Sequence, residues 1–85
     1  MDNNLEKRVA IIGISVQSKD EVTTLNTILS EYGEHIISRT GIPYRDRGIQ
    51  IITVILDAPN DIISALSGKL GRLKGIDSKV SYLKV

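Results

Sequence analysis

Residues 8–16, RVAIIGISV, decide the fold, because they form a short and nearly continuous run of Ile and Val. Such a run is typical of a strand that is covered on both faces. Residues 49–56, IQIITVIL, have the same character and predict a second strand of this kind. Gly13, inside the first run, predicts a bulge or a close approach of another backbone.

The first of these strands is followed by a sequence that is typical of an amphipathic helix. In residues 18–33, Ser18 and Glu21 have the spacing of a capping box, and Gly33 is placed to end the helix. Behind the cap, apolar residues recur every three or four positions, as on the buried face of a helix. These residues are Val22, Leu25, Ile28, Leu29 and Tyr32.

A second helix is predicted in the same place of the second half. Its start is indicated by Asp57, Pro59 and Asn60, and its stop by Gly75. The spacing of its apolar residues again predicts one buried face. These residues are Ile62, Ile63, Leu66, Leu70 and Leu73.

Each half of the chain therefore has the order strand, helix, strand, and a duplicated β-α-β unit is the ferredoxin-like fold. More polar strands at residues 35–40 and 76–85 complete the two units, and residues 41–48, GIPYRDRG, predict the loop between them. We expect an α+β fold, βαββαβ, with a four-stranded antiparallel sheet and two helices on one face. Residues 1–85 form a single domain in this prediction, with a flexible N-terminus at residues 1–7.

The composition excludes several classes of protein. With 41% hydrophobic and 25% charged residues, the chain is too apolar for intrinsic disorder and too interrupted by charge to cross a membrane. Its net charge of +1 gives no overall attraction to nucleic acid or lipid. The absence of cysteine excludes disulfides, thiolate metal sites and a cysteine nucleophile. The N-terminal sequence lacks the apolar run of a signal peptide, so we expect a cytoplasmic protein.

The two inner strands are apolar on both faces, although the helices of this fold cover only one face of the sheet. The other face therefore needs a partner. We expect a homo-oligomer, a dimer or a tetramer, that forms through the sheet face or the edge strands. The alternative is that loops or the N-terminal segment cover this face.

The hairpin sequence contains the first group of candidate ligand-binding residues. Arg39, Arg45 and Arg47 could bring several guanidinium groups to a carboxylate or phosphate, and Tyr44 could stack on a ring. The alternative is a solvated turn in which Asp46 pairs with its arginine neighbours.

The second group lies in the sequence SALSGKLGRLKG of the second helix, and consists of Ser67, Gly68, Lys69 and Arg72. Glycine inside a helix costs about 1 kcal/mol relative to alanine, so Gly68 and Gly71 predict a close approach or a distortion there. The alternative for the cations is that they complement the dipole at the helix end.

The sequence gives little support to catalysis or metal binding. A metal site needs several converging ligands, and His35 is the single histidine of a chain without cysteine. No nucleophile elbow or related catalytic motif occurs in the sequence. We therefore expect a protein that is not an enzyme, with no catalytic residues, no metal and no cofactor.

Three segments carry a resemblance to a known family: GIPYRDRG at residues 41–48, LDAPNDIISALSGKLGRL at residues 56–73, and the strand at residues 8–16. With these, the chain resembles the iron-only hydrogenase system regulator family, a group of small ACT-like proteins. The resemblance implies an ACT-type module that forms oligomers and binds small effectors at subunit interfaces. It assigns no role to individual residues. The outline is also similar to the ligand domain of the nickel-responsive repressor, but His35 alone does not supply that metal site.

We therefore expect a regulatory ACT-like domain that senses a small ligand or docks on a regulatory protein, in transcriptional or maturation control of the [FeFe] hydrogenase system. One alternative is direct DNA binding by an oligomer that aligns several basic hairpins. The other is a small hydrolase, similar to acylphosphatases, that uses its arginines on a phosphate.

Overall fold

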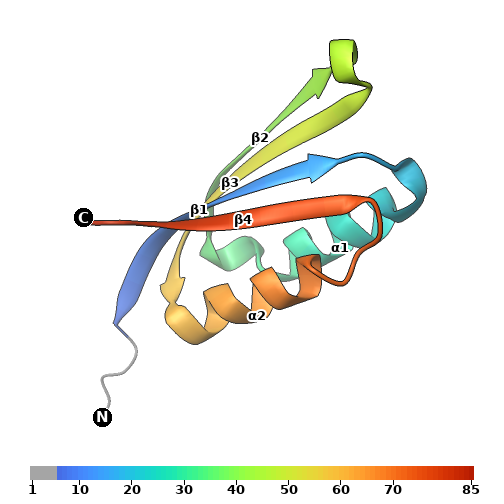
Figure 1. Cartoon of the computed structure of the whole chain (residues 1–85). Coiled ribbons are helices and arrows are strands. Elements are labelled where there is room, and N and C mark those ends of the chain that lie inside the picture. Colours follow the sequence, from blue (N-terminus) through green and yellow to red (C-terminus); the bar gives the residue numbers. More distant parts are fainter. Residues whose placement is uncertain (1–5) are drawn as a thin grey trace.

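The computed structural model describes residues 6–85, in which four strands and two helices alternate as the sequence predicts (Figure 1). Three short 3-10 turns, η2 (Lys19–Glu21), η3 (Gly33–His35) and η4 (Arg45–Arg47), lie between them. The longer elements, in chain order, are β1 (Lys7–Val16), α1 (Val22–Glu31), β2 (Ile36–Tyr44), β3 (Ile49–Pro59), α2 (Asn60–Leu70) and β4 (Ile76–Leu83).

The strands form one antiparallel sheet in the order β2-β3-β1-β4. β1 and β3 are the inner strands and pair without interruption from Lys7 opposite Pro59 to Val16 opposite Gln50. Both helices lie on the same face of the sheet (Figure 1). The predicted ferredoxin-like architecture is therefore confirmed, and the pairing of β1 shows no bulge at Gly13.

The core lies between the sheet and the two helices. Alternate residues of a strand point to opposite faces, so every second residue of β1 and β3 is buried against the helices. The apolar faces of the two helices meet them, as the sequence spacing predicts. The buried residues are Ala10, Ile12, Ile14, Val16, Leu25, Leu29, Ile52, Val54, Leu56, Ala58, Ile63, Leu66, Leu70 and Ile76.

The hairpin differs from its prediction, because β2 continues to Tyr44 and leaves only the turn η4 and Gly48 between the strands. Pro43 is compatible with this longer strand because β2 is an edge strand. Gly48 has a φ of 64°, which closes the turn in the left-handed region. The sequence of residues 41–44 was expected to be a loop, and that expectation is wrong.

The start of the first helix also differs in detail. The Ser18 hydroxyl accepts a hydrogen bond from the Asp20 backbone N–H, at 3.2 Å, and so caps the turn η2. Glu21 does not complete the predicted capping box; its carboxylate accepts a hydrogen bond from the backbone N–H of Lys74, at 3.0 Å. Glu21 therefore joins the start of α1 to the connection that follows α2.

The second helix ends earlier than predicted, at Leu70, with Gly71 as its C-terminal cap. Gly71 is therefore the helix end and not an interruption. Gly68 lies inside α2, and a Cβ added there would have no atom within 4 Å, so the fold of the chain itself gives no close approach at this position. Gly75, predicted as the helix stop, instead ends the connection between α2 and β4, with a φ of 72°.

Residues 1–5 of the expected flexible N-terminus lie outside the described part of the chain. Lys7, also expected to be flexible, is the first residue of β1 and pairs with Pro59. Neither described helix is long and apolar enough to cross a membrane.

Candidate functional site

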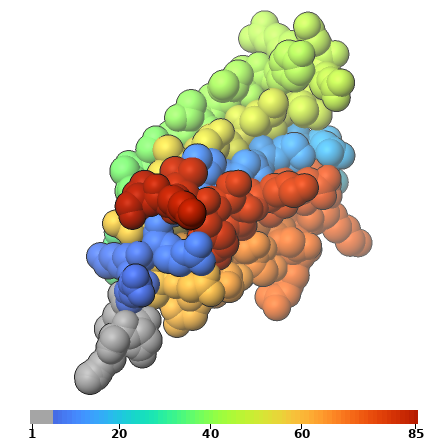
Figure 2. All heavy atoms as spheres, turned by 60° about the vertical axis from the view of Figure 1, so that its left-hand side comes forward, coloured from blue at the N-terminus to red at the C-terminus, as the bar shows by residue number. Residues whose placement is uncertain are grey.

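The hairpin of β2 and β3, residues 41–51, continues past the end of β1, which pairs with β3 only as far as Gln50, and we call it the hairpin arm (Figure 1). In the space-filling view the arm, in green and yellow, stands clear of α2 and of β4 (Figure 2). Its apolar side chains remain partly open to solvent, with Ile42 56% and Tyr44 42% exposed. The arm therefore adds surface that does not serve the core.

A groove of about 440 Å³ lies between the arm and the start of the first helix. We call it the hairpin groove. One wall comes from the end of β1, from η2 and from the start of α1, and the other wall comes from the arm. The lining residues are Val16, Gln17, Ser18, Lys19, Val22, Pro43, Arg45, Gly48, Ile49 and Gln50.

The register of the sheet explains how these residues meet. Val16 is opposite Gln50 on β3, and Gln50 is opposite Pro43 on β2, so all three side chains lie on the helix side of the sheet. Val16 is the last buried residue of β1, and Val22 packs against the core from the first turn of α1. The groove thus has an apolar floor where the two inner strands leave the core.

The rim of the hairpin groove carries two cations from opposite walls, Lys19 of η2 and Arg45 of η4. Within residues 6–85, neither side chain forms a salt bridge. Two cations above an apolar floor favour a small molecule that has both a carboxylate or phosphate group and an apolar part. The groove volume lies within the range of about 300 to 1,000 Å³ that is typical of small-molecule sites.

A second, shallower groove of about 320 Å³ lies on the opposite face of the sheet. We call it the open-face groove. Gly13 and Ser15 of β1 form its floor, with Ile51 of β3 on one side and Lys79 of β4 on the other. Ile49 lines both this groove and the hairpin groove.

A third groove, lined by Ser18, Asp20, Glu21, Lys74 and Gly75, is bridged by the hydrogen bond from Lys74 to Glu21. Among the residues that the structure describes, no three His, Asp or Glu side chains come together as a metal site would require. The His35 ring lies half-buried, with its Nε2 atom 3.8 Å from a carboxylate oxygen of Glu34.

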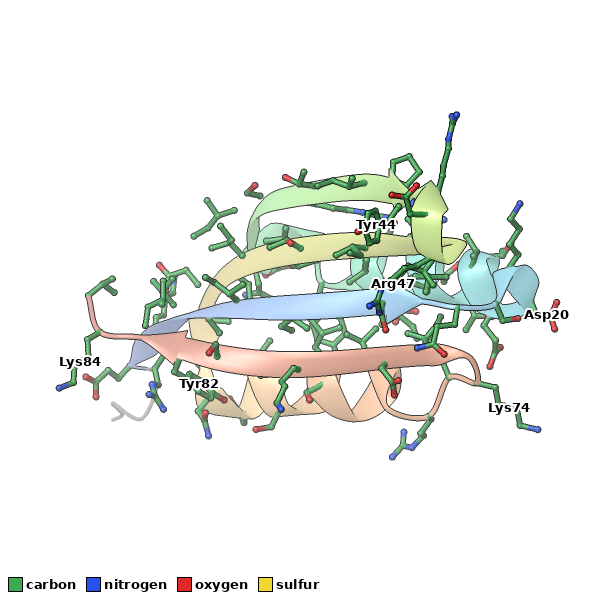
Figure 3. The ribbon with its side chains drawn as sticks, turned by 45° about the horizontal axis from the view of Figure 1, so that its top comes forward. Asp20, Tyr44, Arg47, Lys74, Tyr82 and Lys84 are labelled. Atoms are coloured by element: carbon green, nitrogen blue, oxygen red, sulfur yellow. The ribbon has the colours of Figure 1, made fainter. Side chains whose placement is uncertain are left out.

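The structure separates the candidate residues of the hairpin sequence. Arg45 lines the hairpin groove, whereas Arg39 donates a hydrogen bond to the side chain of Asn26 on α1, at 2.5 Å. Tyr44 is opposite Ile49 and lies on the other face of the sheet. Arg47 follows in η4, and Figure 3 shows it with Tyr44 at the hairpin end of the sheet.

The candidate residues predicted on the second helix, Ser67, Gly68, Lys69 and Arg72, do not line the hairpin groove, and Arg72 lies in the turn after α2 because the helix ends at Leu70. Lys69 is used within the fold: its Nζ atom lies 5.0 Å from the centre of the Tyr32 ring and 3.6 Å from a carboxylate oxygen of Glu31. A side-chain hydrogen bond and the charge of Tyr32, followed by the charge of Glu31, raise the pKa of Lys69 above its ordinary value. This cation therefore holds α2 to α1.

Lys19 and Gln50 line the groove but are not among the residues that the sequence singles out. The strand order of the predicted fold could have located both Lys19 and Gln50 at this groove. In a ferredoxin-like sheet the end of β1 lies beside the start of β3, so the turn after the first strand faces the β2–β3 hairpin. The polar residues that follow Val16 could have been placed there by this rule.

A protein-family model, TM1266-like, described as "Iron-only hydrogenase system regulator, putative", matches residues 8–80. No curated protein matches the chain. Among solved structures, the uncharacterized protein TM1266 from Thermotoga maritima is 39% identical with a TM-score of 0.88, and the match covers 93% of this chain and all of that one.

Two more distant structures show the fold. The ACT domain of the GTP pyrophosphokinase of Chlorobium tepidum is 22% identical, with a TM-score of 0.62 and coverage of 95% of this chain and 91% of that domain. A formyltetrahydrofolate deformylase from Pseudomonas putida is 16% identical, with a TM-score of 0.59. That match covers 86% of this chain and only 28% of the deformylase. The ferredoxin-like fold is therefore of the ACT type.

Proposed function

This chain belongs to the TM1266-like family, and on that premise we propose that it is a regulatory ACT-like domain whose hairpin groove binds a small anionic molecule. The description of the family connects this regulation with the iron-only hydrogenase system. The ligand has an acidic group for the two cations of the rim and an apolar part for the floor. Binding in the groove is the signal that the domain reports.

The observation that carries this proposal is the position of Lys19 and Arg45 on opposite walls of one groove. Their elements, η2 and η4, are 24 or more residues apart in the sequence and meet because β1 and β3 are neighbours. Hydrogen bonds to charged groups contribute about 1.5 to 3 kcal/mol each, so two of them fix an acidic group firmly. The other polar groups of the groove are the side chains of Gln17, Gln50 and Ser18, which can donate or accept hydrogen bonds.

The hairpin groove also suits signalling, because a ligand there contacts two parts of the fold, one packed in the core and one with fewer packing neighbours. The end of β1 belongs to the buried core, whereas the hairpin arm is supported on fewer sides. A ligand that joins Lys19 to Arg45 fixes the arm against the body. Joining two separate elements is a way in which a small ligand changes the surface offered to a regulatory partner.

A second candidate function is direct DNA binding, and the position of Arg45 and Arg47 favours it. Both lie in the exposed turn at the end of an arm that projects from the domain. An oligomer would present several such turns to the phosphate backbone. The acidic Asp46 between the two arginines weakens this candidate relative to the first.

The test is a thermal-shift and calorimetric screen of the full chain against the twenty L-amino acids, short carboxylic acids and nucleoside monophosphates. Lys19→Gln and Arg45→Gln each remove one cation and keep a polar side chain. Lys84→Gln is the matched control, because Lys84 lies at the end of the sheet far from Asp20 and η2 (Figure 3).

We expect each groove variant to weaken binding by about tenfold or more, in line with the loss of one charge-assisted hydrogen bond, and the control to bind as the original chain does. Unchanged affinity in the variant that combines both substitutions would reject the hairpin groove as the site. Native mass spectrometry of gently purified protein gives an independent measurement, since a retained small molecule appears as added mass.

A further inference from the structure

The face of the sheet opposite the helices is largely apolar, although neither α1 nor α2 covers it (Figure 3). We call it the open face. Its side chains are those that alternate with the buried ones, as the pairing of the strands shows. Its apolar residues are Val9, Ile11, Ile42, Tyr44, Ile49, Ile51, Ile55 and Leu83.

We propose that a second copy of this chain covers the open face, in a two-fold symmetric dimer. Four of these side chains keep a large exposed fraction in the single chain: Ile42 56%, Tyr44 42%, Leu83 42% and Ile51 38%. Large apolar patches of this kind on a soluble domain mark interaction surfaces. In an isologous dimer, the same patch serves both copies.

The area of the open face suits a dimer. Four strands about 4.8 Å apart and about ten residues long, at roughly 3.3 Å per residue, span a projected area of roughly 600 Å². Side chains make the accessible area larger than its projection. A stable interface buries about 800 Å² on each partner, so this face alone supplies nearly the required area.

Gly13 gives an independent reason for a partner on this face. It lies in the middle of an inner strand, where glycine costs roughly 0.5 to 1 kcal/mol relative to alanine. The fold of the single chain does not require it, since its φ is not positive and a Cβ added there would meet no atom within 4 Å. Because its side chain is a single hydrogen atom, the open-face groove stays unfilled at Gly13. An apolar side chain of a second copy fits into this groove.

The charges of the open face favour a second copy over nucleic acid. Asp57 and Asp77 are on this face, and so are Lys7 and Lys79. Two acids and two bases make the face complementary to itself, because in a two-fold interface an acid of one copy can meet a base of the other. A nucleic acid would bring phosphates to both carboxylates, which repel them.

The first test measures the oligomeric state of the full chain by sedimentation velocity between about 1 and 100 µM. We expect a dimer for the original chain. Ile51→Lys places a charge in the interface and is expected to raise the dimer dissociation constant at least tenfold. Gly13→Val fills the groove and is expected to do the same, while the single chain stays folded because it has room for the side chain.

Ala65→Lys is the control, because Ala65 is exposed on α2, on the other side of the molecule. It is expected to leave the dimer unchanged. Circular dichroism confirms that all variants are folded. A monomer at 100 µM, or dimers that tolerate both Gly13→Val and Ile51→Lys, would overturn the proposal, the latter result indicating pairing through the edge strands.

The second test uses the absence of cysteine, which makes any introduced thiol unique. Thr53 is opposite Gly13 on the open face, and Ser64 is exposed on α2. We expect the thiol of Thr53→Cys to react with iodoacetamide at 100 µM protein at least tenfold more slowly in the original chain than in the Ile51→Lys monomer. The thiol of Ser64→Cys is expected to react at the same rate in both backgrounds. An equal rate for Thr53→Cys in both backgrounds would contradict an interface on this face.

Discussion

Gly75 and Ser18 approach each other so closely that a Cβ at position 75 would lie 2.5 Å from the Cβ of Ser18. The contact joins the connection before β4 to the turn after β1. It is supported by a hydrogen bond of 2.7 Å from the Gln17 N–H to the Gly75 carbonyl oxygen. Since Gln17 and Ser18 also line the hairpin groove, this contact holds one wall of the candidate site in place.

Gly75→Ala is therefore expected to be strongly destabilising. The φ of 72° costs a residue with a side chain roughly 1 to 2 kcal/mol, and the collision with Ser18 adds to this. We expect the free energy of unfolding to fall by about 2 to 4 kcal/mol, measured by urea denaturation. A loss below about 1 kcal/mol would show that the connection adjusts easily and does not fix the wall of the groove.

Gly68→Ala is the matched substitution at a position without such constraints. Gly68 has helical backbone, is exposed, and has free space where the Cβ would be. Alanine is favoured over glycine inside a helix by about 1 kcal/mol, so we expect this variant to be more stable than the original chain by about 0.5 to 1 kcal/mol. In a domain of this size, that increase corresponds to a rise of roughly 2 to 8 °C in Tm. A fall in Tm would contradict the free space at this position.

The inner strands could be predicted from the sequence because their Ile and Val runs have a single reasonable place, the centre of the sheet. The hairpin arm could not, because Gly41 and Pro43 are typical of loops and are compatible with a strand only at an edge. Edge position is a property of the whole fold, so the arm became visible only when the strand order was known.

The candidate site could be predicted only in part, because its residues are brought together by the whole fold. Arg39 and Arg45 are close in the sequence, but Arg39, on the helix side of β2, donates a hydrogen bond to Asn26 on α1 and does not line the groove. Lys19 meets Arg45 only because the turn after β1 faces the hairpin. Glu21 likewise has its hydrogen-bond donor, the Lys74 N–H, 53 residues away. Contacts over such separations have no local signal in the sequence.

The contacts of Lys69 with Tyr32 and Glu31 predict that the stability of the fold depends on pH. Interactions with Tyr32 and then Glu31 raise the pKa of Lys69 in the folded chain above its ordinary value of 10.5. A raised pKa means that the protonated form stabilises the fold below pH 10.5, and that this stabilisation is lost as the pH rises through the higher folded-state pKa.

The measurement compares the original chain with Lys69→Gln by urea denaturation at pH 8 and at pH 11.5. We expect the original chain to be the more stable at pH 8 and the difference to shrink at pH 11.5. The effect is small because Lys69 lies at the surface, where solvent screens the charges. An equal difference at both pH values would show that the Lys69 charge does not stabilise the packing of α2 on α1.

Salt dependence separates the two candidate functions. A small anion held by Lys19 and Arg45 involves two cations, so its affinity is expected to fall gently, by less than about tenfold, between 50 and 200 mM salt. If the protein contacts several phosphates of DNA, many counterions are released. The affinity for DNA then falls by about a thousandfold or more over this range. Fluorescence anisotropy with a labelled 20-base-pair duplex and calorimetry with the small anion give the two slopes. A steep slope for the duplex, lost in a variant that changes Arg45 and Arg47 to Gln, would favour DNA binding.

Ile49 predicts that ligand binding and dimer formation are coupled, because its side chain borders both the hairpin groove and the open-face groove. A ligand that contacts Ile49 from the helix side changes the position of a residue in the proposed interface. We expect the dimer dissociation constant to change by about fivefold or more when the groove is saturated, which is a typical coupling between two sites. Sedimentation velocity with and without the small anion identified by the screen measures this change.

Coupling between two binding events is reciprocal, so dimer formation must also change the affinity for the ligand. Ile51→Lys supplies the monomer for this comparison, since Ile51 lines the open-face groove and is absent from the hairpin groove. Because a dimer contains two hairpin grooves, the square of the ratio of the ligand Kd in this monomer to the ligand Kd in the original dimer is expected to equal the ratio of the dimer dissociation constants without and with ligand. Two ratios of one would mean that the hairpin groove and the open face act independently, and that Ile49 transmits nothing between them.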